Sequence, residues 1–465
     1  MKNNFLILFC FLGFCMNSQI TTGVDTLWKT GPVSNRINLV FMGDGYTTSQ
    51  IPLFISDVTT TYSYLLNTSP FNNYKNYFNV YAIKCESPQS GVSHPANATD
   101  VTEPVIPVSN VTNYFNTRFD NYGTHRLIYS MNPNEVYNVL ANHFPNYSQI
   151  VILGNSPEYG GAGGAYAVSS THTSSKEIVA HEMGHSFAGL ADEYWAGPSA
   201  GSERPNMTSD GNASTVKWAQ WVGITGVSTY PYGTVAPDNT WFRPHQNCKM
   251  RYLNQPFCAV CKEAIIEKIH SLITPIDSYS PSSSSVVSYT TASRLFKTKL
   301  VLPNPNTLKT TWSVNGVDVA HNQDSLVLNS SAMPVGNNSL LFTVIDTTIL
   351  SKDLVHPFDH TFSVLWNINN LYAGIQEVEA RLEYSMFPNP TSDKINLKYK
   401  LLEESDITVS IVDVEGKTVV AGKKNKQAIG EYKTETDVSQ LKNGTYFLSI
   451  TINSQIINNK FVILK

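Results

Sequence analysis

The chain has 465 residues, which is long for a single hydrophobic core and predicts two to four domains. It is 42% hydrophobic and 15% charged, and its formal net charge is −4. This balance is typical of a globular protein, and without a basic stripe it argues against a nucleic-acid partner.

The first residues have the layout of a secretory signal peptide. Lys2 precedes an apolar run from Phe5 to about Met16, and small and polar residues follow. The run is too short for a stable membrane anchor, and no later stretch reaches the roughly 18 apolar residues that a span needs. We therefore expect residues 1–18 to be a signal peptide and the mature protein to have no stable membrane span. A lipoprotein attached through Cys15 is the alternative.

Two strands and a glycine-rich loop are predicted in the middle of the first half of the chain. The strands are Gln149–Leu153 and Tyr166–Ser169, and the loop Gly160–Gly164 lies between them. An edge strand beside a cleft can bind an extended peptide through main-chain hydrogen bonds. We interpret the loop as the rim of a cleft, with an ordinary flexible turn as the alternative.

The next segment, "THTSSKEIVAHEMGHSFAG", predicts a helix. Ser174 and Glu177 have the spacing of an N-terminal capping box, and Gly189 is a natural C-terminal stop. The helix would therefore begin near Ser174 and end at Gly189.

This helix carries the pattern H-E-x-x-H. His181 and His185 are four residues apart, so a helix presents both imidazoles on one face. Glu182 lies one position off that face, where it can reach a metal-bound water. Catalytic zinc takes three protein ligands and leaves the fourth position to water. The motif alone is only suggestive, but a capped helix followed by two carboxylates favours a zinc site over an ordinary amphipathic helix.

A third ligand is expected soon after the helix. The pattern resembles that of metzincin peptidases, in which a Gly after the second His turns the chain and a ligand follows three residues later. Ala188 occupies the position at which metzincins have Gly, and Gly189 comes one residue later. Counting from Gly189 gives Asp192, so we predict two His and one Asp as metal ligands. Glu193 is the alternative, because a one-residue change in the turn would point the Glu193 side chain, and not that of Asp192, toward the metal.

A methionine and a tyrosine follow in "NCKMRYLNQPFCAVC". Metzincins have a Met turn that forms an apolar floor beneath the metal, and in some branches a Tyr two residues later reaches the metal or the oxyanion. By this resemblance Met250 and Tyr252 would fill these roles, with Tyr252 as a catalytic residue. The alternative is a core Met and a surface Tyr.

The expected mature chain keeps four cysteines. "FCAVC" looks like half of a zinc knuckle, but we favour one or two disulfides over a structural metal site, because exported proteins commonly form disulfides. The pairing stays open; the four residues are Cys85, Cys248, Cys258 and Cys261.

The second half of the chain changes in composition. A Ser/Thr-rich stretch, Ser278–Ser293, is typical of a linker. The short alternating segments "KTKLVL", "KTTWSV", "DSLVLN" and "SLLFTVI" then predict a small β-sandwich. A second β module is predicted from "KINLKY", "ITVSIVD", "YFLSITI" and "KFVILK".

Two family resemblances emerge from these motifs. The segment from His181 to Tyr194 is similar to the motif H-E-x-x-H-x(4)-L-x-D-E-Y of the bacterial IgA-peptidase family of zinc metallopeptidases, with "FMGDGYT" as a further likeness. This resemblance implies a zinc endopeptidase but not immunoglobulin as its substrate. "FPNPTSDKINL" and "LKNGTYFLSI" resemble the C-terminal sorting domain of the type IX secretion system of Bacteroidota. A further adhesion-like sandwich is the alternative there.

Together, these features predict an α+β metzincin-like zinc peptidase domain followed by two β-sandwich (Ig-like) domains. The expected boundaries are 19–275 for the peptidase domain, 276–294 for the linker, 295–372 for the first sandwich and 384–465 for the sorting domain.

The expected function is a secreted or cell-surface zinc endopeptidase that binds Zn²⁺, cleaves protein or peptide substrates, and is exported by the type IX secretion machinery. Glu182 would act as the general base. An inactive adhesin or glycan-binding protein that uses its β modules is the main alternative, and a metal-dependent hydrolase of non-peptide substrates is a third.

Overall fold

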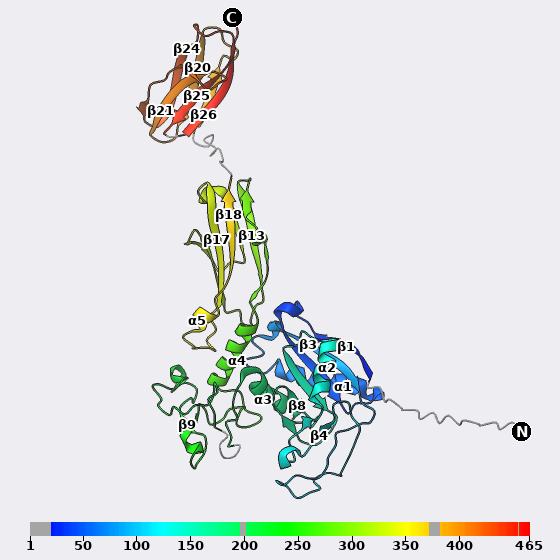
Figure 1. Cartoon of the computed structure of the whole chain (residues 1–465). Helices are drawn as coiled ribbons and strands as arrows, with labels where there is room; N and C mark the ends of the chain where they lie inside the picture. The colour runs from blue at the N-terminus through cyan, green and yellow to red at the C-terminus, as the bar shows by residue number, and fades with distance from the viewer. Residues whose placement is uncertain (1–19, 196–200, 372–381, 454) are drawn as a thin grey trace, which may run out of the picture. The chain divides into compact units, whose positions relative to one another are not determined.

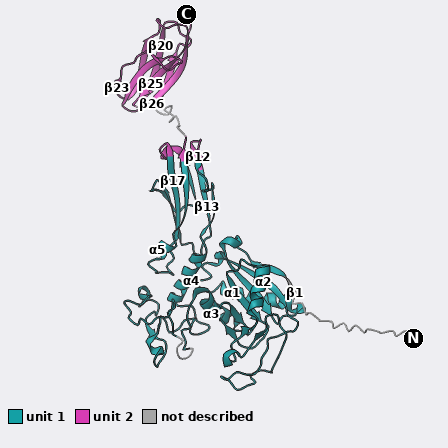
Figure 2. Cartoon of the chain, in the orientation of Figure 1, with its two compact units in different colours: residues 1–287, 295–328, 337–368 teal, residues 288–294, 329–336, 369–465 magenta. Residues whose placement is uncertain are grey.

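The computed structural model describes residues 20–195, 201–371, 382–453 and 455–465 (Figure 1). The expected signal peptide, residues 1–18, lies outside the described residues. The chain forms two compact units, which Figure 2 colours separately. The first comprises residues 1–287, 295–328 and 337–368, and the second comprises residues 288–294, 329–336 and 369–465.

A six-stranded sheet lies at the centre of the first unit. Its order is β1-β3-β2-β6-β8-β7, with parallel pairing from β3 to β8 and antiparallel pairing of the edge strands β1 and β7. The strands are β1 (Ile20–Trp28), β2 (Ile37–Asp44), β3 (Phe78–Glu86), β6 (Gln149–Gly154), β7 (Gly161–Ala162) and β8 (Ala167–Ser169).

Both faces of this sheet are buried, as expected for parallel strands that are continuous apolar runs. Along β2, Leu39 and Phe41 belong to one core and Val40 and Met42 to the other. The first core also contains side chains of three helices, α1 (Ile51–Leu65), α3 (Ser175–Ala188) and α4 (Ala259–Leu272). The second contains side chains of α2 (Pro133–His143). Helix α3 is therefore held against the sheet in the same layer as α1 and α4.

The strands predicted before α3 are confirmed as β6 and β8. The glycine-rich loop supplies one more strand, because Gly161–Ala162 pairs with β8 as the edge strand β7. The remaining short strands of this region are β4 (Thr117–Arg118), β5 (Tyr129–Ser130), β9 (Tyr230–Pro231) and β10 (Phe242–Arg243).

The predicted helix is confirmed as α3, and its C-terminal stop is Gly189, whose φ of 66° lies in the left-handed region that favours glycine. The predicted capping box is wrong. Ser174 makes no side-chain cap, and Glu177 instead accepts hydrogen bonds from Tyr64, from the Lys249 ammonium and from the backbone of Asn254. A buried ammonium needs a counter-charge, so it captures the carboxylate that would otherwise cap the helix.

A strand-rich region follows α4, with several sheets. In the first unit β11, β13 and β16 form one sheet, and β18, β17, β14 and β15 lie in this order in another. The bounds are β11 (Ile276–Ser280), β12 (Val287–Tyr289), β13 (Ser293–Leu300), β14 (Leu308–Val314), β15 (Val317–His321), β16 (Ser325–Asn329), β17 (Gly336–Asp346), α5 (His356–Asp359) and β18 (Phe362–Asn370).

The four segments predicted as strands in this region overlap β13, β14, β16 and β17, although Val301 and Leu302 lie beyond the end of β13 and Asp324 precedes β16. Part of the expected linker is also ordered, since β11 pairs antiparallel with β13, with Ile276 opposite Leu300. A Ser/Thr-rich composition therefore does not exclude strand pairing, because Ser and Thr can occupy the exposed positions of a ladder.

The second unit contains a three-stranded sheet, β19-β20-β24, and a further sheet in the order β22-β21-β25-β26, with β23 paired to β21. The segments predicted as strands in this module overlap β20, β21, β25 and β26, although Asp413 lies beyond the end of β21 and Leu464 and Lys465 beyond the end of β26. The bounds are β19 (Leu382–Phe387), β20 (Lys394–Leu401), β21 (Ser405–Val412), β22 (Thr418–Val420), β23 (Asn425–Gln427), β24 (Gly430–Asp437), β25 (Gly444–Ile452) and β26 (Gln455–Ile463).

One buried carboxylate joins the helical layer of the first unit to its strand-rich part. Asp346, the last residue of β17, accepts hydrogen bonds from Tyr74 at 2.5 Å, from His270 Nε2 at 3.0 Å and from Thr307 at 2.5 Å. Burial raises the pKa of Asp346, but these hydrogen bonds outweigh it and lower the pKa below its ordinary value. The carboxylate is therefore ionised and holds α4 and β17 together.

We expect Asp346→Ala to destabilise the first unit by at least about 2 kcal/mol, because it leaves several buried donors without an acceptor. Denaturant unfolding of the purified protein measures this loss. The matched control is Asp318→Ala, which removes an exposed carboxylate that accepts from Ser313 and should change stability by less than about 0.5 kcal/mol. Equal unfolding midpoints for the two variants would contradict the assignment.

Candidate metal centre

The two histidines of α3 point their Nε2 atoms at a common position. His181 Nε2 and His185 Nε2 are 3.1 Å apart. The Nδ1 atom of His181 lies 2.9 Å from the carbonyl of Lys249, and that of His185 lies 2.8 Å from the carbonyl of Leu190. A carbonyl only accepts, so each Nδ1 carries a proton and each Nε2 faces the common position, where it can present a lone pair to a metal once any proton there has left.

Asp192 completes this group of atoms. Its Oδ1 lies 3.0 Å from His181 Nε2 and 3.2 Å from His185 Nε2. Zinc bound tetrahedrally to N and O ligands at about 2.0–2.2 Å would separate those atoms by about 3.4 Å. Burial lowers the pKa of His185, but the hydrogen bond and charge of Asp192 outweigh it and raise that pKa to about 9. The position between these atoms therefore favours positive charge, and the residues fit one zinc ion.

Glu182 lies beside the histidines on the same helix, and its carboxylate is close enough to them to belong to the same group of potential ligands. Burial raises the pKa of Glu182, while the neighbouring His181 and His185 act in the opposite direction. The glycine-rich loop approaches this carboxylate so closely that a Cβ at Gly163 would collide with Glu182 Oε2. The loop therefore forms one wall around the Glu182 carboxylate.

Met250 forms a floor beneath α3. Its side chain is fully buried, and a Cβ placed on Gly184 would lie 2.5 Å from its sulfur. Gly184 therefore allows the turn that carries Met250 to approach the helix between its two histidines. The carbonyl of Met250 accepts a hydrogen bond of 2.7 Å from the backbone N–H of Glu193, so the same turn also holds the residue next to Asp192.

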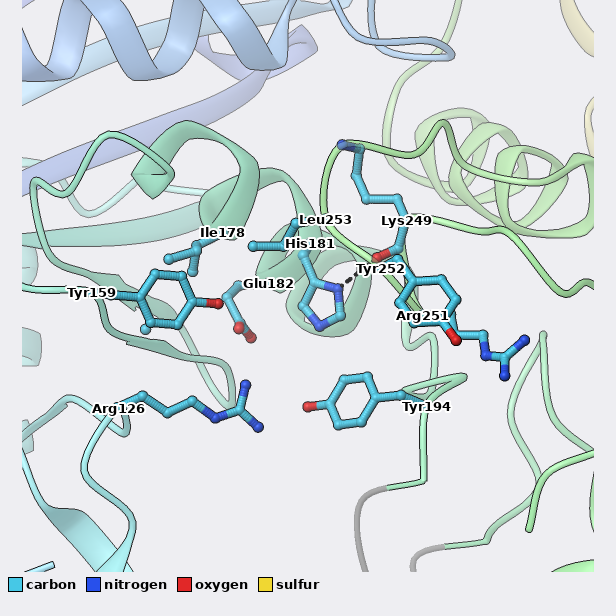
Figure 3. Close-up of a pocket in the computed structure, with 11 residues that line it drawn as sticks. Arg126, Tyr159, Ile178, His181, Glu182, Tyr194, Lys249, Arg251, Tyr252 and Leu253 are labelled. Carbon is cyan, nitrogen blue, oxygen red and sulfur yellow. Dashed lines mark hydrogen bonds between the residues drawn. The ribbon is translucent and has the colours of Figure 1, made fainter. Parts of the chain in front are cut away.

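Two tyrosines lie near His181, and their hydroxyl groups point in different directions. Tyr252 is 48% exposed, and in Figure 3 its hydroxyl points away from Glu182 and toward Arg251, whose guanidinium lies 4.9 Å from the ring centre. Tyr194 stacks on the His181 ring with centroids 6.3 Å apart, and its hydroxyl points into the pocket.

Sequence reasoning missed Arg126 and Tyr159, which reach the same pocket from segments before α3. Figure 3 shows the Tyr159 hydroxyl and the Arg126 guanidinium directed toward Glu182. The Arg126 guanidinium also lies 5.9 Å from the centre of the Tyr194 ring. Neither residue belongs to a motif with fixed spacing from the helix, so the linear sequence gives no signal for them.

These side chains line a cleft of about 570 Å³ and an adjoining pocket of about 260 Å³. The cleft contains the two histidines, Glu182 and Asp192, and its rim includes the edge strand β7. The two cavities share Arg126, Tyr194 and Gly161 as lining residues.

Glu193 faces away from this cleft. It is fully buried and accepts hydrogen bonds from Asn206 Nδ2 at 3.0 Å and from the Cys261 thiol at 3.2 Å. The structure therefore brings Asp192, and not Glu193, together with the two histidines.

The expected disulfides are absent from this structure, in which all four described cysteines are free. Cys248 Sγ and Cys261 Sγ lie 3.6 Å apart, whereas a disulfide bond is about 2.05 Å long. Cys85 belongs to the core on the opposite face of the sheet. The prediction was wrong because spacing along the chain does not determine the distance between thiols.

Other histidines and carboxylates gather away from the cleft. His94 Nε2 lies 3.3 Å from both Glu103 and Asp120, and His125 Nδ1 lies 3.0 Å from Asp120. A second group consists of Glu267, His356 and His360. Both groups have ligand types that suit a cation, and neither was apparent in the sequence.

The ion pair of Glu177 with Lys249 positions the site, because Lys249 also orients His181. Their side chains are only 8% and 1% exposed. We expect Glu177→Gln to lower the free energy of unfolding by about 3–5 kcal/mol, because it leaves a buried ammonium without its counter-charge. Glu203→Gln is the control, since Glu203 forms an exposed ion pair with Lys217 that should contribute about 1 kcal/mol or less. Similar losses in denaturant titrations of the two variants would count against this role.

Comparison with known families gave two matches. Residues 26–240 match the family described as IgA Peptidase M64, and residues 385–464 match the secretion system C-terminal sorting domain. The comparison with curated proteins gave no match.

Similarity to solved structures is low. Dimeric latent PorU from Porphyromonas gingivalis is 12% identical with a TM-score of 0.16, over 40% of this chain and 19% of that chain. The Bacteroides ovatus protein SGBP-B, in complex with a mixed-linkage heptasaccharide, is 12% identical with a TM-score of 0.15, over 39% and 42%. A tetra-tandem repeat of a large adhesion protein is 19% identical with a TM-score of 0.18, over 39% and 48%. The chain spans less than half of each, and such TM-scores give no basis for a fold assignment.

The sorting domain indicates secretion or display at the cell surface, and it implies interaction with the type IX secretion machinery. Within the described parts of the chain, no helix has the length and apolar character needed to cross a membrane. Residues 26–240, which contain the converging His181, His185 and Asp192 side chains, match the IgA Peptidase M64 family, and this match supports a peptidase activity.

Proposed function

We propose that the protein is a secreted zinc-dependent endopeptidase that hydrolyses peptide bonds of protein substrates. The observation that carries this proposal is the convergence of three acceptor atoms, from His181, His185 and Asp192, at separations of 3.0 to 3.2 Å. These three atoms converge beside the Glu182 carboxylate, in a region that matches a peptidase family that is typically metal-dependent.

The three ligands and the ion have separate tasks in this proposal. When bound, zinc supplies Lewis-acid chemistry, which lowers the pKa of water to about 7 and polarises a carbonyl. His181 and His185 are fixed in direction by the carbonyls of Lys249 and Leu190, and Asp192 adds the negative charge that favours a cation. A metal site with only three protein ligands leaves room for water and substrate.

Glu182 is the proton carrier. Its carboxylate takes a proton from the attacking water as the oxygen adds to the scissile carbonyl, and then gives that proton to the leaving amine. Burial raises the pKa of Glu182, which moves the carboxyl group toward the range in which one group can both accept and donate a proton. The absence of a side chain at Gly163 leaves room for this carboxylate in the cleft.

Substrate binds as an extended strand along β7. This strand is the edge of the sheet; Gly161 lines both cavities near Glu182, and Ala162 lines the larger one. The Gly161 N–H already donates to the Arg126 carbonyl, so a peptide would use the remaining main-chain groups of this edge, without regard to its own sequence. The scissile bond would then lie between the rim and the two histidines.

The developing oxyanion is stabilised by donors that already point into the pocket. Arg126 and Tyr194 have this orientation, and the cationic guanidinium is the stronger donor. Tyr252 is the residue that the family resemblance suggests for this role, and it would serve only after its hydroxyl turns toward His181.

We expect Glu182→Gln to retain the metal and the fold but to lose about 10² to 10⁴ in the rate of peptide hydrolysis, because an amide does not accept the proton. Cleavage of a proteome-derived peptide mixture, followed by mass spectrometry, measures the rate. Activity close to that of the parent protein would show that Glu182 is not the base. Chelation should abolish cleavage too, whereas an adhesin would keep its binding.

We expect Asp192→Ala to lower zinc affinity by orders of magnitude, because two histidines alone hold zinc poorly. Competition with a chromophoric chelator measures the affinity, and Glu182→Gln is the matched control that changes a neighbouring carboxylate without removing a ligand. Unchanged zinc affinity in the Asp192 variant would remove it from the proposed ligand set.

A further inference from the structure

Four side chains that the peptidase chemistry does not use meet in one buried cluster behind the cleft. They are the carboxylate of Glu193 and the thiols of Cys248, Cys258 and Cys261. All four residues are buried, and their ligand atoms lie within 4.8 Å of one another. They come from three separate segments: the turn after α3, the turn that carries Met250, and the start of α4.

The distances suit a shared metal ion. Cys248 Sγ and Cys261 Sγ are 3.6 Å apart, and Cys261 Sγ is 3.2 Å from Glu193 Oε1. In a tetrahedral site with Zn–S bonds of about 2.3 Å the sulfur atoms are about 3.8 Å apart. The thiols are thus too far apart to be bonded to each other and close enough to bind one ion.

Two features of the surroundings suit a cation in this cluster. Glu193 is fully buried, and its Oε2 has no hydrogen-bond partner among the described residues. Cys258 is the N-cap of α4, and Cys261 lies in its first turn, where the helix dipole favours a thiolate. The backbone N–H of Cys258 also donates to Cys248 Sγ over 3.3 Å.

We propose that Glu193, Cys248, Cys258 and Cys261 form a second, structural zinc site. Thiolates select zinc over calcium or magnesium, and a complete set of four protein ligands leaves no open position for catalysis. On binding, each thiol releases its proton to solvent. This inference goes beyond the proposed peptidase function and does not depend on it.

A zinc ion in this cluster would stabilise the turn that carries Asp192, a proposed ligand in the cleft. Glu193 directly follows Asp192, and its backbone N–H is bonded to the carbonyl of Met250. An ion that joins Glu193 to Cys248 therefore closes a small loop between the turn that carries Asp192 and the turn that carries Met250. Loss of this ion would remove one restraint on the Asp192 turn without changing a residue of the cleft.

Zinc X-ray absorption spectroscopy on the purified full chain tests the proposal. The double variant His181→Ala/His185→Ala removes the zinc of the cleft, so the remaining signal reports the second site. We expect sulfur scatterers at about 2.3 Å. The histidine and carboxylate groups elsewhere in the chain would give only nitrogen and oxygen scatterers. A protein without zinc–sulfur scattering would overturn the proposal, as would a disulfide among the three cysteines found by non-reducing peptide mapping.

Two single variants identify the ligands. Cys258→Ser should lose the sulfur signal and about one zinc per chain, whereas Cys85→Ala, at a buried cysteine outside the cluster, should keep both. Should Cys258→Ser fail to fold, the spectrum of the double histidine variant decides. If that double variant keeps all of the zinc of the parent protein, the proposed cleft site fails, while the sulfur signal still reports the second site on its own.

Discussion

The turn at residues 248–252 is the constraint on which the whole site depends. The carbonyl of Lys249 orients His181, and its ammonium pairs with a carboxylate at the start of the same helix. One residue later, Met250 packs under the helix, and its carbonyl holds Glu193. The turn therefore contacts both the helix that carries the histidines and the segment that brings the third carboxylate back to them. A displacement of this single turn would misalign several side chains at once.

The parts of the site that the sequence predicted are those determined by local geometry. A spacing of four residues puts His181 and His185 on one helix face wherever the helix lies, and Gly189 ends that helix through its own backbone preference. Glu177 shows where this reasoning stops. Its spacing from Ser174 fits a capping box, but a lysine more than 70 residues later in the chain captures it instead. The choice depends on a buried charge that only the folded chain brings near.

The same distinction separates the strands from the cysteines. Alternating segments in the second half of the chain could be predicted as strands because the alternation of apolar and polar residues indicates which face is buried. A cysteine belongs to no such pattern, so the sequence does not indicate which other cysteine lies near it. Cys85 and Cys248 look equivalent in the sequence, yet they lie in cores on opposite faces of the central sheet. Arg126 was missed for the same reason, because a loop residue without a fixed spacing reaches the pocket only through the path of the whole chain.

The edge strand β7 has consequences for selectivity. It is two residues long, and both are small, Gly161 and Ala162. A peptide lying along it would contact the backbone and almost no side chain, so this strand would not select among the side chains of the bound peptide. Discrimination among substrates would have to come from side chains that reach the cleft from other segments, such as Tyr194 and Arg126, which supply a ring face and a positive charge. Altering the preference for particular amino acids would then require changes outside this strand.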